Sequence, residues 1–144
     1  MLILKKLYSF HVPTEDMVHI YCLYIRAILE QSCVVWGSSL TCGQEFDLER
    51  VQKVALRIIL DDNYLSYQHA LDLTGLPTLK ERRAQLSLTF AKKCVKNEKT
   101  VDMFPLRKNG PNTRKPELYK VTGARTSRLA KSAIPSMQRL LNQC

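Results

Sequence analysis

The chain has 144 residues, of which 45% are hydrophobic and 24% charged, and its formal net charge at pH 7 is +9. These values are ordinary for one globular domain, or for one domain with a tail, and they exclude low-complexity and collagen-like chains. No apolar run reaches the roughly 18 residues that a membrane-spanning helix needs, and the first residues lack the charge order of a secretory signal, so we expect no membrane partner.

The first quarter of the chain is typical of two helices separated by a proline. A short helix is expected over residues 2–10, and Val12-Pro13 ends it. A long helix then runs from its expected N-cap, Thr14, to about Trp36. Apolar residues cover most of its faces, so we expect it to be the central core helix, with Trp36 mostly buried.

A capping box predicts the next helix. Thr41 and Gln44 have the T-x-x-Q spacing in which each residue satisfies a backbone donor of the other. The helix that follows has apolar residues at helical spacing on one face and Glu49 and Lys53, an i,i+4 pair, on the other. It is expected to end at Asp61-Asp62-Asn63, because these residue types favour turns.

Two further helices are predicted before residue 97. Ser66 is the expected N-cap of a short helix that ends at Gly75. Thr78 and Glu81 form a second capping box, T-x-x-E, which opens a helix that runs to about Lys96. The core face of this last helix is expected to carry Leu79, Leu86, Phe90 and Cys94.

The pattern changes after residue 97. From Lys99 to about Ala130, prolines, glycines and many Lys and Arg residues interrupt any helical or strand periodicity of apolar residues. One short helix is expected after this stretch, from about Pro135 to Leu141. The predicted fold is therefore all-α, with about five helices in an irregular bundle. We expect a helical domain over residues 1–97 and a basic, poorly ordered segment over residues 98–144.

Charge is distributed unequally along the chain. Residues 1–76 hold 6 Lys and Arg against 9 Asp and Glu, whereas residues 77–144 hold 16 against 4, so the net charges are −3 and +12. Such asymmetry favours a polyanionic partner, most often nucleic acid. The alternative is a solvated basic tail without a specific partner.

The candidate phosphate contacts are the basic residues of the helix before residue 97 and of the tail. At helical spacing Arg82, Lys93 and Lys96 share one sector of their helix, although a solvated face would show the same pattern. In the tail, Tyr119 is placed among cations and could stack on a base. We expect phosphate contact from Arg82, Arg83, Lys92, Lys93, Lys96, Arg114 and Lys115. The remaining tail cations in this group are Arg107, Lys108, Lys120, Arg125 and Arg128.

No residue pattern predicts catalysis, a cofactor or a metal site. Asp61-Asp62 is the one acidic pair that suggests a two-metal site, but it lacks a third carboxylate and follows a helix end, where Asp is typical of a turn. The five cysteines include no C-x-x-C pair, which argues against a zinc module and against a disulfide framework. Their use favours a reducing compartment, nuclear or cytoplasmic.

Three long motifs resemble the C-terminal part of a known family. Residues 20–30 read IYCLYIRAILE and precede Val35-Trp36, residues 47–59 read DLERVQKVALRII, and residues 70–83 read ALDLTGLPTLKERR. In the same order they resemble the hIYcsYIRpvLEy…pvW, LErvQkrALRII and ALellgLPtLeeRR segments of non-LTR retrotransposon reverse transcriptases, closest to the jockey-like group. The resemblance covers about residues 2–142, including Phe90-Ala91-Lys92-Lys93 and Met103-Phe104-Pro105.

The resemblance implies the thumb of an RNA-directed DNA polymerase and the segment beyond it. The catalytic aspartates of that family lie in a strand turn of the palm, Y-x-D-D or A-D-D, which this sequence lacks, and Asp61-Asp62 falls in a variable loop of the family. We therefore expect a non-catalytic fragment of a decayed or truncated element that binds the backbone of RNA or DNA without sequence preference.

Two other functions remain open at this point. The first is a helical module that docks on a protein, such as the remainder of a retroelement polymerase, without binding nucleic acid. The second is an autonomous metal enzyme that uses Asp61 and Asp62. An exposed apolar patch would favour the docking module, whereas a continuous positive surface would favour nucleic-acid binding.

Overall fold

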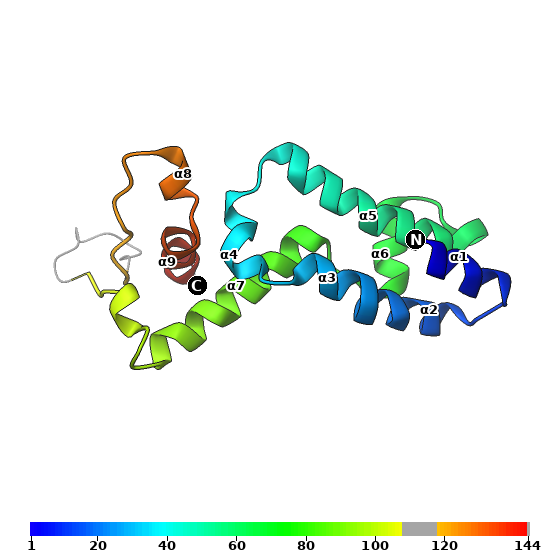
Figure 1. Cartoon of the computed structure of the whole chain (residues 1–144), viewed down its shortest axis with the longest axis horizontal. Helices are drawn as coiled ribbons and strands as arrows, with labels where there is room; N and C mark the ends of the chain where they lie inside the picture. Colours follow the sequence, from blue (N-terminus) through cyan, green and yellow to red (C-terminus); the bar gives the residue numbers. More distant parts are fainter. Residues whose placement is uncertain (108–117, 144) are drawn as a thin grey trace. The chain divides into compact units, whose positions relative to one another are not determined.

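The computed structural model describes residues 1–107 and 118–143 (Figure 1). Within these ranges every regular element is helical, and the one β feature is an isolated antiparallel bridge between Leu106 and Tyr119. The predicted all-α class is therefore confirmed, with more helices than expected. The α-helices are α1 (Leu2–Ser9), α2 (Thr14–Ile20), α3 (Ala27–Glu30), α4 (Cys33–Trp36), α5 (Cys42–Leu60), α6 (Tyr67–Thr74), α7 (Leu79–Lys96), α8 (Ser127–Ala130) and α9 (Ala133–Gln143).

Contacts among the residues divide the chain into two compact units. Unit 1 comprises Met1–Gln31 and Thr41–Arg82, and unit 2 comprises Ser32–Leu40 and Arg83–Cys144. The short segment Ser32–Leu40 therefore belongs with the C-terminal part of the chain, and α7 contributes to both units. The division into domains at residue 97, which composition suggests, stays a prediction.

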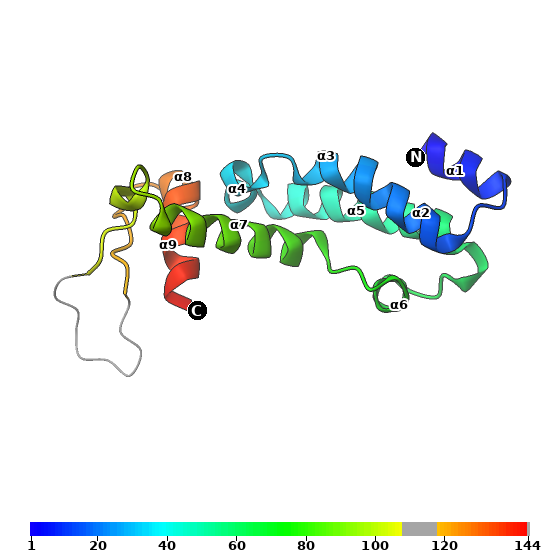
Figure 2. The ribbon, with the colours of Figure 1, turned by 90° about the horizontal axis from the view of Figure 1, so that it is seen from below.

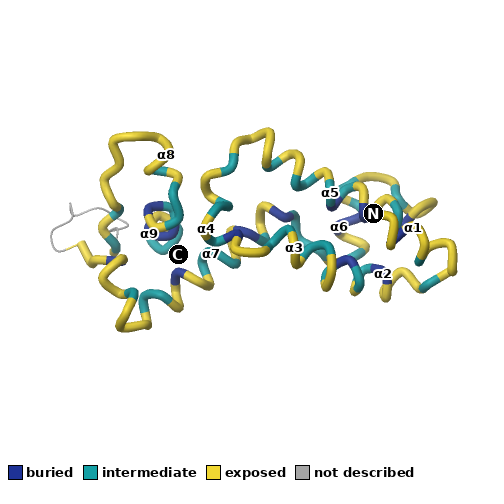
Figure 3. Tube along the Cα trace, in the orientation of Figure 1, coloured by how far each residue is buried: buried dark blue, intermediate teal, exposed yellow. Residues whose placement is uncertain are grey.

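Unit 1 packs around α5. The helices α1, α2 and α6 all contact α5 (Figure 2), and its buried side chains lie in its second half (Figure 3). The core combines residues of these helices with Tyr21, which directly follows α2. Its members are Leu4, Met17, Tyr21, Ala55, Leu56, Ile59, Leu60, Ala70 and Leu71. The central core helix is thus α5, and the expectation that the helix from Thr14 would fill this place is wrong.

The helix that begins at Thr14 is covered on one side only. Met17 and Tyr21 are buried, whereas Leu23, Tyr24 and Ile28 are 69%, 64% and 72% exposed. A π-helical segment, Tyr21–Arg26, joins α2 to α3 within it. Its apolar residues on two faces therefore do not imply burial on two faces.

The same helix ends earlier than its sequence pattern predicts. The last residue of α3 is Glu30, and Ser32 has a left-handed backbone with φ of 53°. A left-handed residue interrupts the i→i−4 hydrogen bonds of a right-handed helix, so the chain starts a new short helix, α4, at Cys33. The predicted unbroken extension to Trp36 is wrong, but Trp36 itself has intermediate exposure, so most of its surface is covered as expected.

The capping box before α5 is confirmed. The hydroxyl of Thr41 accepts the backbone N–H of Gln44 at 3.3 Å, and the Gln44 side chain accepts the backbone N–H of Thr41 at 3.0 Å. The helix ends at Leu60, and a 3-10 turn, Asp61–Asn63, follows it. Asp61 has a positive φ of 40°, and its carboxylate accepts the hydroxyl of Tyr8 at 2.5 Å, which ties α1 to the end of α5.

The starts and stops of α6 and α7 also follow local signals. Ser66 accepts the backbone N–H of His69 at 3.2 Å, and Gly75 ends α6 in the left-handed conformation with φ of 64°. Thr78 and Glu81 exchange the two hydrogen bonds of a capping box, at 3.1 and 3.2 Å. These four positions are where the sequence places them, because a cap depends on residues three or four apart.

A buried amide connects three elements of unit 1. Gln52 of α5 is fully buried, and its side-chain oxygen accepts the hydroxyl of Tyr21 at 2.8 Å. Its side-chain NH₂ donates to the carbonyl of Pro77 and to the hydroxyl of Tyr67, both at 3.0 Å. All hydrogen bonds of this amide are therefore directed inward, and they hold the chain before α7 against α5.

Glu49, one turn before Gln52, completes this network. Its carboxylate accepts the hydroxyl of Tyr67 and, at 3.2 Å, the backbone N–H of Leu79. Lys53, the expected i,i+4 partner of Glu49, instead lies over the rings of Phe46 and Tyr67. The pair predicted from spacing does not form, because the carboxylate is engaged by α6 and α7.

Unit 2 has a smaller core. Ala91 of α7, Phe104 and Met137 of α9 are buried together, and Cys94 and Tyr119 pack partly against them. Phe90, which helical spacing assigned to the core, is instead 44% exposed. Its neighbour Ala91 takes the core position.

Side-chain amides of α9 organise the irregular part of unit 2. Gln138 is fully buried, donates to the carbonyl of Met103 and accepts the N–H of Thr122, both at 2.7 Å. Asn142 bonds to both the N–H and the carbonyl of Tyr119, at 2.8 and 2.9 Å. These bonds give the described parts of the tail defined backbone positions that the sequence pattern does not predict.

Candidate nucleic-acid interface

The division into units separates charge in the same direction as the division at residue 76 does. In its described residues unit 2 holds eleven Lys and Arg against two acidic residues, Glu98 and Asp102, a net charge of +9. Unit 1 holds eight Lys and Arg against ten Asp and Glu, a net charge of −2. The excess of positive charge expected of a polyanion-binding protein thus belongs to one compact unit.

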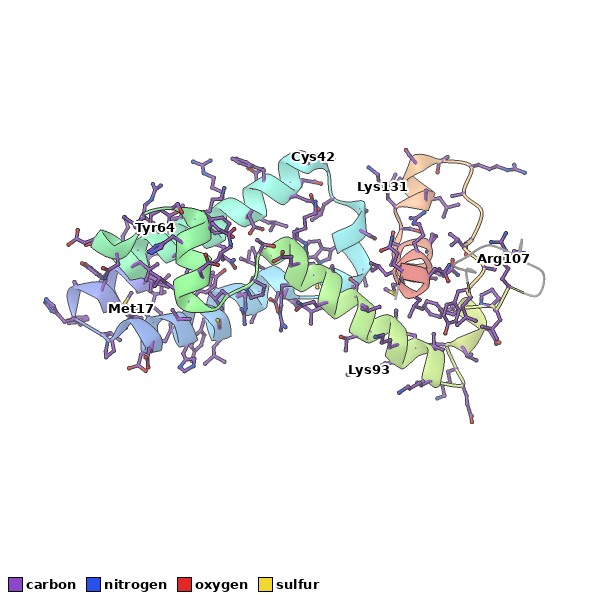
Figure 4. All side chains as sticks on the ribbon, turned by 180° about the vertical axis from the view of Figure 1, so that it is seen from behind. Met17, Cys42, Tyr64, Lys93, Arg107 and Lys131 are labelled. Carbon is purple, nitrogen blue, oxygen red and sulfur yellow. The ribbon has the colours of Figure 1, made fainter. Side chains whose placement is uncertain are left out.

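Three of the expected phosphate contacts lie together at the end of α7. Lys92, Lys93 and Lys96 are all exposed, while Ala91, which directly precedes them, faces the core. Figure 4 labels Lys93 on this helix. None of the ion pairs among the described residues involves these lysines. Their charges also interact favourably with the C-terminal end of the helix dipole, so they stabilise α7 whether or not a ligand is present.

Arg82 is engaged by a carboxylate of unit 1. Its Nε lies 3.1 Å from Oε1 of Glu30, and the Nε of Arg26 lies 3.4 Å from the same oxygen. The side chain of Glu30 is largely buried, so this shared ion pair is less screened than a surface pair. Of the predicted stripe of Arg82, Lys93 and Lys96, the first residue therefore takes part in a structural contact between α3 and α7.

Arg83 is buried in unit 2. The residue is 5% exposed, and its Cδ would lie 3.5 Å from a Cβ atom at Gly37. Its stem therefore lies beside the segment between α4 and α5. In this conformation the guanidinium does not offer a surface for a phosphate.

The tail contributes further cations, of which Lys120, Arg125 and Arg128 are named in the sequence analysis and Lys131 is not. Arg114 and Lys115 fall outside the described residues, and so does Lys108. Around α8, four side chains are exposed, namely Lys120, Arg125, Arg128 and Lys131. The signal that marks them in the sequence is the absence of any Asp or Glu after residue 117. Arg139 differs from them, because its guanidinium donates to the carbonyl of Ala130 and to the hydroxyl of Ser136.

Tyr119, the residue that could stack on a base, is half-buried against the core of unit 2. Its backbone is paired with Asn142 and with the bridge partner Leu106. The exposed aromatic ring of this unit is instead that of Phe90, one helical turn before Lys93.

The described residues contain no group of three or more His, Cys, Asp or Glu side chains placed to hold a metal ion. Asp61 is engaged by Tyr8, and this hydrogen bond raises the pKa of the tyrosine. Burial raises the pKa of the Cys22 thiol, which disfavours the reactive thiolate. A hollow of about 270 Å³ in unit 1, between α2, α5 and α6, contains Glu15 and His19 as its titratable lining residues.

No single helix among the described residues is both long enough and apolar enough to cross a bilayer. The segments Thr14–Glu30 and Cys33–Ser39 meet both criteria only when they are taken together as a bent pair. Comparison with protein-family models, with curated proteins and with solved structures gives no match.

Proposed function

We propose that this protein binds nucleic acid non-specifically through its backbone phosphates, with unit 2 as the principal surface. The observation that supports the proposal is the segregation of charge, eleven Lys and Arg against two carboxylates in the described residues of unit 2. Such an excess attracts a polyanion at long range and releases counterions when phosphates are neutralised. Lys92, Lys93 and Lys96 are its best-placed contacts, because they are exposed and form no ion pair with a carboxylate of residues 1–107 or 118–143.

The proposed role is that of a non-catalytic fragment similar to the thumb of a non-LTR retrotransposon reverse transcriptase. The three sequence motifs support this reading, since they occur in order over most of the chain. The palm carboxylates that carry polymerisation in that family have no counterpart in this sequence. On this reading the chain grips a template–primer backbone and leaves the chemistry to another polypeptide.

Salt dependence of binding tests this proposal. Fluorescence anisotropy with a labelled RNA oligonucleotide should show an affinity that falls by roughly 10³ between 50 and 200 mM salt if about six phosphates are contacted. The double variant Lys92→Gln/Lys93→Gln should flatten the slope of log affinity against log salt. The matched control is Lys5→Gln/Lys6→Gln, which removes two adjacent exposed lysines from α1 of unit 1. No binding at low salt, or equal slopes for both variants, would refute the assignment to α7.

A second candidate function is docking on a protein, and the exposed face of the helix from Thr14 favours it. Leu23, Tyr24 and Ile28 are each more than 60% exposed and lie within two helical turns. The partner that the resemblance suggests is the remainder of a retroelement polymerase. Titration calorimetry with the catalytic part of a jockey-like polymerase should show binding that Leu23→Ser/Ile28→Ser abolishes. Leu65→Ser, at an equally exposed position outside the helices, is the control and should leave binding intact.

A further inference from the structure

One aromatic side chain of unit 2 is exposed to solvent. Phe90 of α7 is 44% exposed. The other aromatic residues described in this unit are buried or half-buried, namely Trp36, Phe104 and Tyr119. Phe90 belongs to neither of the two hydrophobic cores, and its neighbour Ala91 takes the core position instead. Core packing therefore does not account for an aromatic ring at this position.

No cation of the described residues lies over the ring of Phe90. The cations that do lie over aromatic rings are Lys53 and Arg57, and both belong to unit 1. An exposed ring that no cation covers can stack on another flat apolar group. Every nucleobase presents such a face, so aromatic side chains are the usual stacking partners of single-stranded nucleic acid.

Two lysines follow this ring at helical spacing. Lys93 is three residues beyond Phe90, and Lys96 is three residues beyond Lys93, so each side chain is a neighbour of the next on the surface of α7. Successive members are about 4.5 Å apart along the helix axis. Both lysines are exposed and form no ion pair with a described carboxylate, and Figure 4 labels Lys93 on this helix.

The charge around this part of α7 is positive with every carboxylate counted in full. Residues 90–104 contain four lysines, at positions 92, 93, 96 and 99, and two acidic residues, Glu98 and Asp102. These two are also the only acidic residues among the described residues of unit 2, so no other described element of the unit adds negative charge. The ring of Phe90 is therefore beside cations that attract a phosphate backbone.

We propose that Phe90, Lys93 and Lys96 form a site for unpaired nucleotides of RNA or DNA. The ring stacks on a base, and the two lysines contact the flanking phosphates. This inference rests on the proposed function and specifies its substrate, a single strand rather than a duplex. In a duplex the base faces are stacked on one another, whereas a single strand offers them to a side chain. Stacking uses a face that every base has, so binding remains independent of sequence.

The first test removes the bases and keeps the phosphates. Fluorescence anisotropy at 50 mM salt compares a labelled single strand, a strand of the same length that is abasic throughout, and a duplex. The wild-type chain should bind the base-bearing strand on the order of tenfold more tightly than the abasic strand, as expected for base stacking. Phe90→Ala should remove this preference and leave binding of the abasic strand and of the duplex unchanged. The matched control is Phe10→Ala, which removes a 77% exposed phenylalanine from unit 1 and should keep the preference.

Salt dependence separates the ring from the lysines. Lys93→Gln/Lys96→Gln should reduce the slope of log affinity against log salt by about 1.4, the value for two phosphates of a single strand. The same variant should bind the abasic strand more weakly, because phosphates remain there. Phe90→Ala should leave the slope unchanged, since stacking neutralises no phosphate and releases no counterion.

A tryptophan at the same position reports the stacking directly. Phe90→Trp keeps a ring, so it should retain the preference for the base-bearing strand. It adds a second tryptophan to the single one of the chain, and the added emission should be quenched by the base-bearing strand but not by the abasic strand. The wild type gives the background from Trp36. Thermal unfolding by circular dichroism shows whether each variant is folded, and Phe90→Trp supplies the measurement if Phe90→Ala unfolds.

The failure of this inference is distinguishable from the failure of the proposed function. If the wild type binds no nucleic acid at low salt, both fail. If the wild type binds with a steep salt dependence but does not distinguish the base-bearing from the abasic strand, the proposed function stands and the stacking site is overturned. A preference that Phe90→Ala retains, or an unquenched tryptophan in Phe90→Trp, would overturn the site as well and leave Phe90 as an apolar surface residue.

Discussion

The side chain of Glu49 caps a helix that begins thirty residues later in the chain. Its carboxylate accepts the backbone N–H of Leu79 at 3.2 Å, although Thr78 and Glu81 already form the local capping box of α7. The N-terminus of α7 is thus fixed both by its own sequence and by α5. Because Glu49 is hydrogen-bonded to Tyr67 as well, α5, α6 and α7 meet at one carboxylate.

The buried amide beside Glu49 is expected to be important for stability. Gln52→Met leaves the hydroxyl of Tyr21 and the carbonyl of Pro77 without their partners, so the free energy of unfolding should fall by about 2–3 kcal/mol. Urea titration measures this loss. Gln68→Met, at an exposed position on α6, is the control and should cost less than about 0.5 kcal/mol. Equal losses for the two variants would contradict the network.

Stability should fall in alkaline solution because of buried tyrosines. Burial holds the pKa of Tyr21 well above its ordinary value of 10.0, and burial together with the hydrogen bond to Glu49 does the same for Tyr67. A raised folded-state pKa means that the folded protein keeps protons that the unfolded chain has released. The stabilisation is therefore complete below pH 10 and is lost as the pH rises through 10 toward the folded-state pKa.

Urea midpoints measured from pH 7 to 11 check this dependence. The decline above pH 10 should be shallower for Tyr21→Phe than for the wild type, because one of the linked protons is gone. Tyr24→Phe, at a 64% exposed position on the same helix, should reproduce the wild-type decline. A decline that is identical in all three proteins would exclude Tyr21 as a contributor.

The two glycines of unit 1 should respond in opposite directions to alanine. Gly75 ends α6 with φ of 64°, and no atom lies within 4 Å of a Cβ placed there, so Gly75→Ala should cost about 1 kcal/mol through backbone strain alone. Gly43, in the first turn of α5, has equally open surroundings and no positive φ. Gly43→Ala should therefore be neutral or stabilise by up to about 1 kcal/mol. Thermal unfolding compares the two.

The chain alone should not polymerise DNA. Incubation with Mg²⁺, dNTPs and a primed RNA template should leave the primer unextended, because the palm carboxylates have no counterpart in this sequence. Gel electrophoresis of the labelled primer gives the readout. Extension that Asp61→Asn and Asp62→Asn abolish would contradict this expectation and restore the metal-enzyme alternative.

Most local features of the fold were predictable from the sequence, although Thr14 is the first residue of α2 rather than its N-cap, which is Pro13. The caps at Thr41, Ser66 and Thr78 and the left-handed Gly75 are all present, because each depends on hydrogen bonds within four residues or on the freedom of a single glycine. The all-α class follows from the same helical spacing. The end of the helix from Thr14 was not predictable in this way, since Ser32 adopts its left-handed φ in a run of residues without a breaker.

The candidate site likewise has one property that the sequence determines and another that only the tertiary structure decides. Its excess of Lys and Arg over Asp and Glu is a property of the sequence alone, because charge needs no partner to be counted. Tertiary structure decided which cations reach solvent, by burying Arg83 against Gly37 and by pairing Arg82 with Glu30, fifty-two residues away. It also placed Lys53 over the rings of Phe46 and Tyr67 rather than beside Glu49. Such contacts join residues far apart or around a turn, and spacing along one helix does not encode them.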